Sequence, residues 1–244
     1  MDEMTDNIEI NSEEQQAADF RKDLADLCDQ RAANYGFLAR MYRVEADAEL
    51  LDSLRAMRFP ASTGNATADS GYRLLTSYLG KVWDNTVTEL AVDYVKTFIG
   101  NTNELDGAAF PFESVYTSEK RLLMQEARDE VLAIYRAYGL DKSLTWKEGE
   151  DHIALELEFM KILSQRTAEA LRADDEDSAF TLLMTQKNFL GDHLGAWAPM
   201  LTVDMRHFAR TDFYKGLADI TDGFLEADGE LLDDLLSENG SESA

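Results

Sequence analysis

The sequence predicts an all-α fold, a single helical domain of about nine or ten helices. Apolar residues recur about every 3.6 residues along most of the chain, which is the period of an α-helix. Alternation of apolar and polar residues, the pattern of a half-buried strand, is essentially absent, and no internal repeat is visible. The 244 residues, of which 45% are hydrophobic, are enough to bury a sizeable core.

Four helices are expected in the first part of the chain, over residues 19–42, 47–57, 72–79 and 90–99. Pro60 and Gly64 lie in a polar loop over residues 59–68, between the second and the third helix. Gly100 is expected to cap the fourth helix, because glycine readily adopts the backbone conformation that ends many helices.

Residues 100–116 are the longest internal segment without helical periodicity. Thr117, Ser118 and Glu119 follow it and predict the start of the next helix. The remaining helices are expected over residues 117–138, 150–171 and 212–225, with others beginning near residue 178 and starting or bending at Pro199. A connection as long as 100–116 also allows a two-lobed layout with a hinge there.

The charge balance narrows the classes of partner. The chain has 23 basic and 48 acidic residues, a net charge of −25, which opposes binding to nucleic acid or to anionic membrane surfaces. Acidic residues concentrate at both ends, so residues 1–18 are expected to be a disordered or loosely attached tail. Residues 227–244 are a second acidic tail, either mobile or forming a short amphipathic helix that docks on the body or occupies a groove. Residues 19–226 then form the domain.

Compartment and covalent chemistry are constrained by what the sequence lacks. The longest stretch without a charged residue, 193–203, is too short to span a membrane. The first residues lack the basic start and apolar run of a signal peptide, so the expected location is cytoplasmic. The single cysteine, Cys28, excludes an internal disulfide and a cysteine-based metal centre.

Motifs of common enzymes are missing as well. The sequence has no GxxxxGK phosphate loop, no GxGxxG, no HExxH and no GxSxG. Of the three histidines, only His207 completes an Asp-x-x-His element, whereas a di-iron bundle needs two Glu-x-x-His motifs. We therefore expect a binding protein rather than an enzyme, with no cofactor and no metal site.

Two segments carry information about function. Residues 93–100 and 110–116 hold five aromatic side chains, which either anchor a loop on the core or line a binding surface. In residues 148–160, acidic side chains in the first helical turn suit the positive end of the helix dipole. His152 and Glu156 lie four residues apart, on one helix face, where they can pair.

These motifs resemble those of the TorD/DmsD family of redox-enzyme maturation chaperones. That family ends a helix with an aromatic residue, then a Phe four residues later and a Gly, here Tyr94, Phe98 and Gly100. A Pro-aromatic-x-Ser-aliphatic-aromatic loop follows, here residues 111–116.

The later motifs continue the resemblance in order. A Glu-Pro-x-Asp-His motif opens a helix that carries Glu-Leu and Phe-Met, here residues 148–160, with Gly149 in the place of the proline. His-Leu-x-x-Trp-x-Pro corresponds to residues 193–199. The resemblance covers about residues 30–225.

The resemblance implies an all-helical cytoplasmic chaperone for a molybdopterin-containing oxidoreductase of the DMSO/TMAO reductase kind. Such a chaperone binds the twin-arginine signal peptide and the apo form of the catalytic subunit precursor before cofactor insertion and export, as a monomer or a domain-swapped dimer. A peptide that is cationic at one end and apolar in its middle needs carboxylates and an apolar groove. The residues expected to bind it are Tyr94, Phe98, Pro111, Phe112, Glu113, Ser114, Tyr116, Asp151, His152 and Glu156.

Two alternatives remain open at this point. Asp151 and His152 could act as an acid/base pair in a helical enzyme or nucleotide-binding protein, which turnover without a partner would reveal. The chain could instead be a permanent assembly subunit, which co-purification with a stoichiometric partner would reveal.

Overall fold

The computed structural model describes the backbone of residues 2–100, 107–119 and 122–241, and within these ranges the side chains of residues 14–237. The part described contains ten α-helices, two π-helical turns and no β-strand, which confirms the all-α prediction. The α-helices are α1 (Asp2–Arg43), α2 (Ala48–Ala56), α3 (Ala66–Leu79), α4 (Thr86–Tyr94), α5 (Glu113–Thr117), α6 (Glu126–Ala137), α7 (Ile153–Arg172), α8 (Glu176–Phe189), α9 (Gly195–Phe208) and α10 (Asp212–Ser241). The π-helical turns are η1 (Val95–Ile99), which continues α4, and η2 (Leu190–Leu194), which joins α8 to α9.

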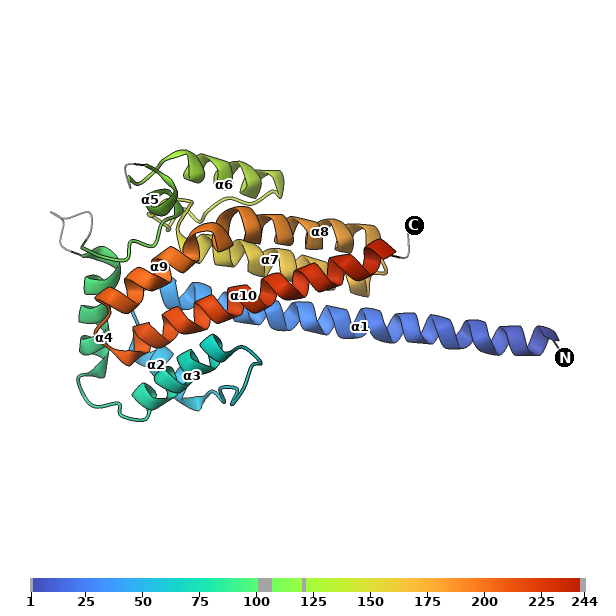
Figure 1. Cartoon of the computed structure of the whole chain (residues 1–244), viewed down its shortest axis with the longest axis horizontal. Helices are drawn as coiled ribbons and strands as arrows, with labels where there is room; N and C mark the ends of the chain where they lie inside the picture. Colours follow the sequence, from blue (N-terminus) through green and yellow to red (C-terminus); the bar gives the residue numbers. More distant parts are fainter. Residues whose placement is uncertain (1, 101–106, 120–121, 242–244) are drawn as a thin grey trace.

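The long helices form a bundle, and α4 stands across one end of it (Figure 1). α1 packs chiefly against α7, and α10 packs chiefly against α3. Glycines allow the second contact to be close, because a Cβ atom at Gly71 would lie only 2.6 Å from the carbonyl oxygen of Gly216. The end of the bundle at α4 is where the motif residues gather.

Most of the buried apolar side chains belong to one main hydrophobic core. It includes Tyr42 and Leu75 from before the 100–116 segment and Leu157, Trp197 and Tyr214 from after it. This core spans both sides of the 100–116 segment, so the described residues do not separate into two lobes there. A smaller second cluster, which includes Leu24, Cys28 and Leu171, packs α1 against α7 and α8. Residues 101–106 of the expected hinge lie outside the described residues.

The helix predicted to start at residues 117–119 begins later, at Glu126. Thr117 and Ser118 close α5 instead: the Thr117 hydroxyl donates to the carbonyl oxygen of Glu113, and the Ser118 N–H donates to that of Ser114. The same residue types that favour a helix start also cap a helix end when their donors find free carbonyls.

The backbone is helical toward both ends of the chain. The backbone of residues 2–18 continues α1 beyond the bundle as a helix, because extending an existing helix costs less than nucleating one (Figure 1). Its loose attachment stays a prediction. Residues 227–241 continue α10, where Leu232 is buried and Asp228 accepts hydrogen bonds from Arg31 and Tyr35.

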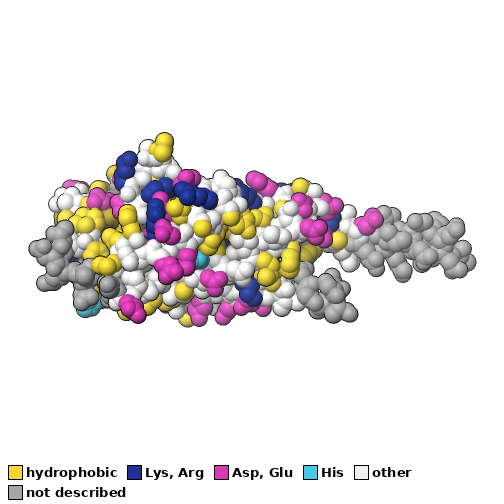
Figure 2. Space-filling model, turned by 90° about the horizontal axis from the view of Figure 1, so that it is seen from above, with side chains coloured by type: hydrophobic (Ala, Val, Ile, Leu, Met, Phe, Trp, Pro, Cys, Tyr) yellow, Lys and Arg dark blue, Asp and Glu magenta, His cyan; other side chains and the backbone are white. Residues whose placement is uncertain are grey.

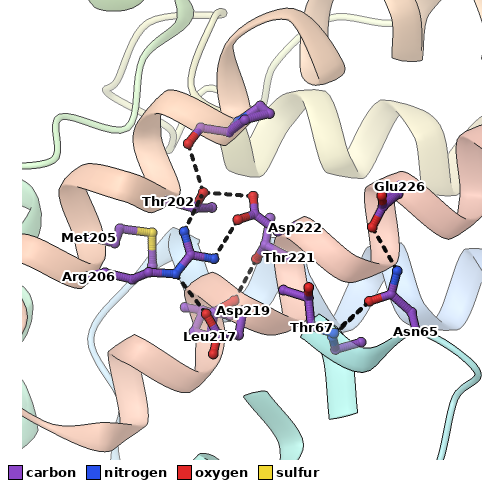
Figure 3. Close-up of polar contacts among 12 residues, drawn as sticks. Asn65, Thr67, Thr202, Met205, Arg206, Leu217, Asp219, Thr221, Asp222 and Glu226 are labelled. Atoms are coloured by element: carbon purple, nitrogen blue, oxygen red, sulfur yellow. Dashed lines mark hydrogen bonds and ion pairs between the residues drawn. The ribbon is translucent and has the colours of Figure 1, made fainter. Parts of the chain in front are cut away.

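A polar cluster joins α9 to α10 (Figure 3). The Arg206 guanidinium donates to Asp219 at 2.7 Å and to Asp222 at 2.5 Å, and the Thr202 hydroxyl lies 2.7 Å from Asp222. Bonds between charged partners of this kind are among the stronger side-chain hydrogen bonds. They hold α9 in register on α10 and so fix Trp197, which α9 carries into the core.

Candidate functional site

Two of the motif segments, residues 110–116 and residues 148–160, lie next to each other in the structure. Phe112 and His152 form an isolated antiparallel bridge, in which the Ile153 N–H donates to the carbonyl oxygen of Pro111 at 3.0 Å. The Glu113 N–H donates to the carbonyl oxygen of Asp151 at 2.9 Å. These hydrogen bonds attach residues 110–116, the aromatic loop, to the start of α7.

Asp151 stabilises the junction between the aromatic loop and the start of α7. Its carboxylate accepts hydrogen bonds from the Ser114 N–H at 3.0 Å and from the Ser114 hydroxyl at 2.5 Å. The side chain is completely buried, and its other oxygen, Oδ1, has no hydrogen-bond partner. Buried carboxylates cost free energy unless they are well bonded, so this arrangement ties the start of α5 firmly to the start of α7.

His152 is the N-cap of α7. Its Nδ1 accepts a hydrogen bond from the Ala154 N–H at 3.0 Å, and its ring meets the edges of Phe112 and Trp146. Burial lowers the pKa of His152 to about 3, so the imidazole is neutral at physiological pH. The expected pairing with Glu156 is absent, because the Glu156 carboxyl group accepts instead from the Trp197 indole N–H at 3.0 Å.

Two further acids lie behind the junction. Glu113 is buried against His193, whose Nδ1 is 3.1 Å from the carboxylate. Burial and the neighbouring charge of Glu113 raise the pKa of Glu156 well above its ordinary value. Burial also lowers the pKa of His193, but the hydrogen bond and charge of Glu113 outweigh it and leave that pKa raised. These buried acids therefore contact His193 and Trp197 inside the protein, and their carboxyl groups are not exposed to solvent.

A groove of about 750 Å³ opens beside the junction, between the end of α1, α4 with η1, and the aromatic loop. Its described lining is Arg43, Val44, Glu45, Ala46, Asp47, Val87, Ala91, Tyr94, Phe98, Ile99, Phe110, Pro111, Phe112, Glu148 and His152. Most of these side chains are apolar or aromatic. The size and the lining suit a short peptide segment.

Acidic side chains stand at the rim of the groove. Glu45 and Glu148 both line the groove and are exposed. Burial is the largest cause that raises the pKa of Tyr94 to about 12, and the negative charges of Glu45 and Glu148 are the next largest. The Tyr94 hydroxyl donates to the carbonyl oxygen of Tyr42 at 3.0 Å, which places this ring at the end of α1. Asp47 is the third rim carboxylate and pairs with Arg40 at 3.2 Å.

The predicted site residues divide into two sets. Those that line the groove are Tyr94, Phe98, Pro111, Phe112 and His152. Those that lie behind it are Glu113, Ser114, Tyr116, Asp151 and Glu156. Tyr116 stacks on the Trp197 ring and donates to Asp204 at 3.1 Å.

Sequence reasoning missed part of the lining. Glu45, Asp47 and Val87 come from segments with no motif, and nothing in their local pattern sets them apart from other surface residues. Glu148 stood within the recognised motif but was not chosen, although its position before the α7 cap was a usable signal.

Among the described residues, no group of three potential ligands is placed to hold a metal ion. None of the described helices is long and apolar enough to cross a membrane.

The family model of the nitrate reductase delta subunit matches residues 65–203, more than half of the chain. The chain belongs to this family. The expected membership of the TorD/DmsD family is thus confirmed, because TorD proteins are among the curated relatives of the chain.

Three of these relatives show the extent of the similarity. The chaperone protein TorD of Vibrio cholerae is 28% identical over 150 residues, which are 62% of this chain and 65% of that protein. The TorD of Vibrio parahaemolyticus is 24% identical over 210 residues, covering 84% and 95% of the two chains. The TorD of Vibrio atlanticus is 25% identical over 217 residues, covering 86% and 98%. The chain spans just under two thirds of the length of the first and nearly all of the other two.

Proposed function

We propose that this chain is a cytoplasmic maturation chaperone that binds the twin-arginine signal peptide, and the apo form, of a molybdopterin-containing oxidoreductase of the DMSO/TMAO reductase kind. Binding precedes cofactor insertion and export of that enzyme. The relatives named as chaperones support this class of function. The observation that carries the proposal is the groove, which joins an aromatic wall to two exposed carboxylates.

The chemistry of the groove is complementary to such a peptide. Glu45 and Glu148 line the groove, are exposed, and can each accept from an arginine guanidinium. Phe98 and Phe112 supply apolar contact for the segment beside the arginine pair. The net charge of −25 speeds the encounter with a cationic peptide, although salt limits its reach to about 10 Å.

The buried residues behind the groove have a different task in this proposal. Asp151 and Ser114 position the loop that carries Phe112, and Glu113 holds that loop to His193. A guanidinium group cannot reach the Asp151 carboxylate without opening the structure, because that carboxylate is fully buried. The arginine contacts are therefore assigned to the exposed rim.

The test is isothermal titration with leader peptides of molybdoenzyme precursors encoded near this gene. A Glu45→Gln/Glu148→Gln variant is expected to bind about 10- to 100-fold more weakly and with less salt dependence, because two charge-assisted hydrogen bonds are lost. Phe112→Ala should weaken binding with the salt dependence intact. The matched control is Glu169→Gln/Glu230→Gln, which makes the same change in net charge at exposed positions outside the groove.

Absence of binding to any of these leaders, together with turnover of a substrate by the purified chain, would contradict the proposal. An acid/base role for Asp151 and His152 is not favoured. Both side chains are buried, and the His152 Nδ1 already accepts a backbone hydrogen bond.

A further inference from the structure

An apolar stripe runs along the outer side of α4 and η1. Val92, Val95 and Ile99 are all strongly exposed large hydrophobic side chains. Val87 and Ala91 continue the stripe toward the start of α4. None of these five side chains is charged, on a chain in which 29% of the residues are. Figure 2 shows hydrophobic side chains at this end of the molecule.

Hydrogen bonds on the buried face of α4 fix the rotation of this helix about its own axis. The apolar stripe on the opposite face is exposed for this reason. The Asp93 carboxylate accepts from the Arg210 N–H at 2.9 Å and from the Thr211 N–H at 2.8 Å. The Tyr214 hydroxyl donates to the carbonyl oxygen of Leu90 at 3.3 Å. These bonds tie one face of α4 to the junction of α9 and α10 and leave the opposite face to solvent.

The π-turn keeps the stripe in line. In η1 the Gly100 N–H donates to the carbonyl oxygen of Val95 at 2.8 Å, five residues back. A π-turn holds more residues per turn than an α-turn. Ile99 therefore lies on the same side of the helix as Val95 and Ala91, whereas a regular α-helix would have placed it further round the helix axis. Such turns are frequent at functional sites.

The stripe is continuous with the groove. Val87, Ala91 and Ile99 belong to both, since each lines the groove. A peptide that lies in the groove beside Tyr94 therefore leaves it along α4, next to the apolar side chains of Val92 and Val95.

We propose that the stripe Val87, Ala91, Val92, Val95 and Ile99 docks the apolar segment of the same leader peptide, in helical form, alongside α4 and η1. This inference rests on the proposed function and assigns the two halves of the peptide to two surfaces. The stripe covers 12 residue steps, or about 18 Å, which matches about three turns of a bound helix.

The experiment uses the full chain and two synthetic peptides. The long peptide carries an adjacent arginine pair followed by twelve residues of leucine and alanine, and the short peptide ends soon after the arginine pair. Wild type should bind the long peptide at least about 10-fold more tightly, and Val92→Asn/Val95→Asn should remove that advantage while leaving the affinity for the short peptide unchanged. Val203→Asn is the matched control, because Val203 is 61% exposed on α9 and Val92 is 57% exposed on the stripe.

The outcomes separate the two proposals. Equal affinity of wild type for both peptides, or a full advantage of the long peptide in the Val92→Asn/Val95→Asn variant, would overturn the stripe as its docking surface. A change in the oligomeric state of that variant, measured by sedimentation, without any change in peptide affinity would assign the stripe to a second copy of the chain and overturn the inference. Failure of wild type to bind either peptide would contradict the proposed function and the inference together.

Discussion

Asp151→Asn removes one charge at the point where the aromatic loop meets α7. In the wild type, the Asp151 carboxylate accepts two hydrogen bonds from Ser114, and no solvent reaches it. A hydrogen bond to a charged group contributes about 1 kcal/mol more than one between neutral groups, so two such bonds set the loss at about 2 kcal/mol. For a chain of this size, that loss lowers Tm by about 4–8 °C.

The assay combines thermal melting with titration of the leader peptide. Ser114→Ala should lower Tm in the same direction, and the double variant should lose less than the sum of the single losses, with a coupling of about 1–2 kcal/mol. The folded Asp151→Asn variant should bind the leader as tightly as wild type, because the carboxylate faces Ser114 and not the groove. A variant with unchanged Tm and a large loss of leader affinity would refute this reasoning and return Asp151 to the arginine contacts.

Three further predictions concern buried titratable groups. Burial and the nearby charge of Glu113 raise the pKa of Glu156, so the wild type loses stability as pH rises above 4.5, where the unfolded chain releases the proton and the folded chain retains it. Glu156→Gln should therefore gain in Tm relative to wild type between about pH 5 and pH 8 in thermal melts, and a constant difference would contradict the shift. Burial lowers the pKa of His152 to about 3, so stability falls as pH drops below 6.5, where the unfolded chain takes up the proton. His152→Asn, which keeps a capping oxygen, should show a smaller fall in Tm between about pH 7 and pH 5. Asp228→Asn leaves the buried Arg31 charge unpaired and should cost about 3–5 kcal/mol in urea unfolding, whereas Arg31→Met/Asp228→Leu should cost much less. Equal losses in these two variants would show that the ion pair itself supplies the stability.

Local patterns were sufficient for most of the helices. The end of η1 at Gly100 and the end of α6 near Gly139 were predictable because both glycines have positive φ, a conformation that glycine adopts without strain. The start of α6 was not predictable, because Thr117 and Ser118 suit a helix start and a helix end equally well. Which of the two they form depends on the carbonyl groups that α5 leaves free.

The sequence alone determined the helical periodicity, the excess of acidic over basic residues and the order of the motifs, since each depends on residue type and spacing. The convergence of the aromatic loop on α7 was decided by tertiary structure, through backbone hydrogen bonds between segments about 40 residues apart. Tertiary structure also decided the surroundings of the acids. Asp151 faces Ser114 and is buried, whereas Glu45, with no motif around it, stands exposed at the groove. A carboxylate has the same chemistry at either position, and only its burial and its neighbours determine whether it holds the fold or meets a ligand.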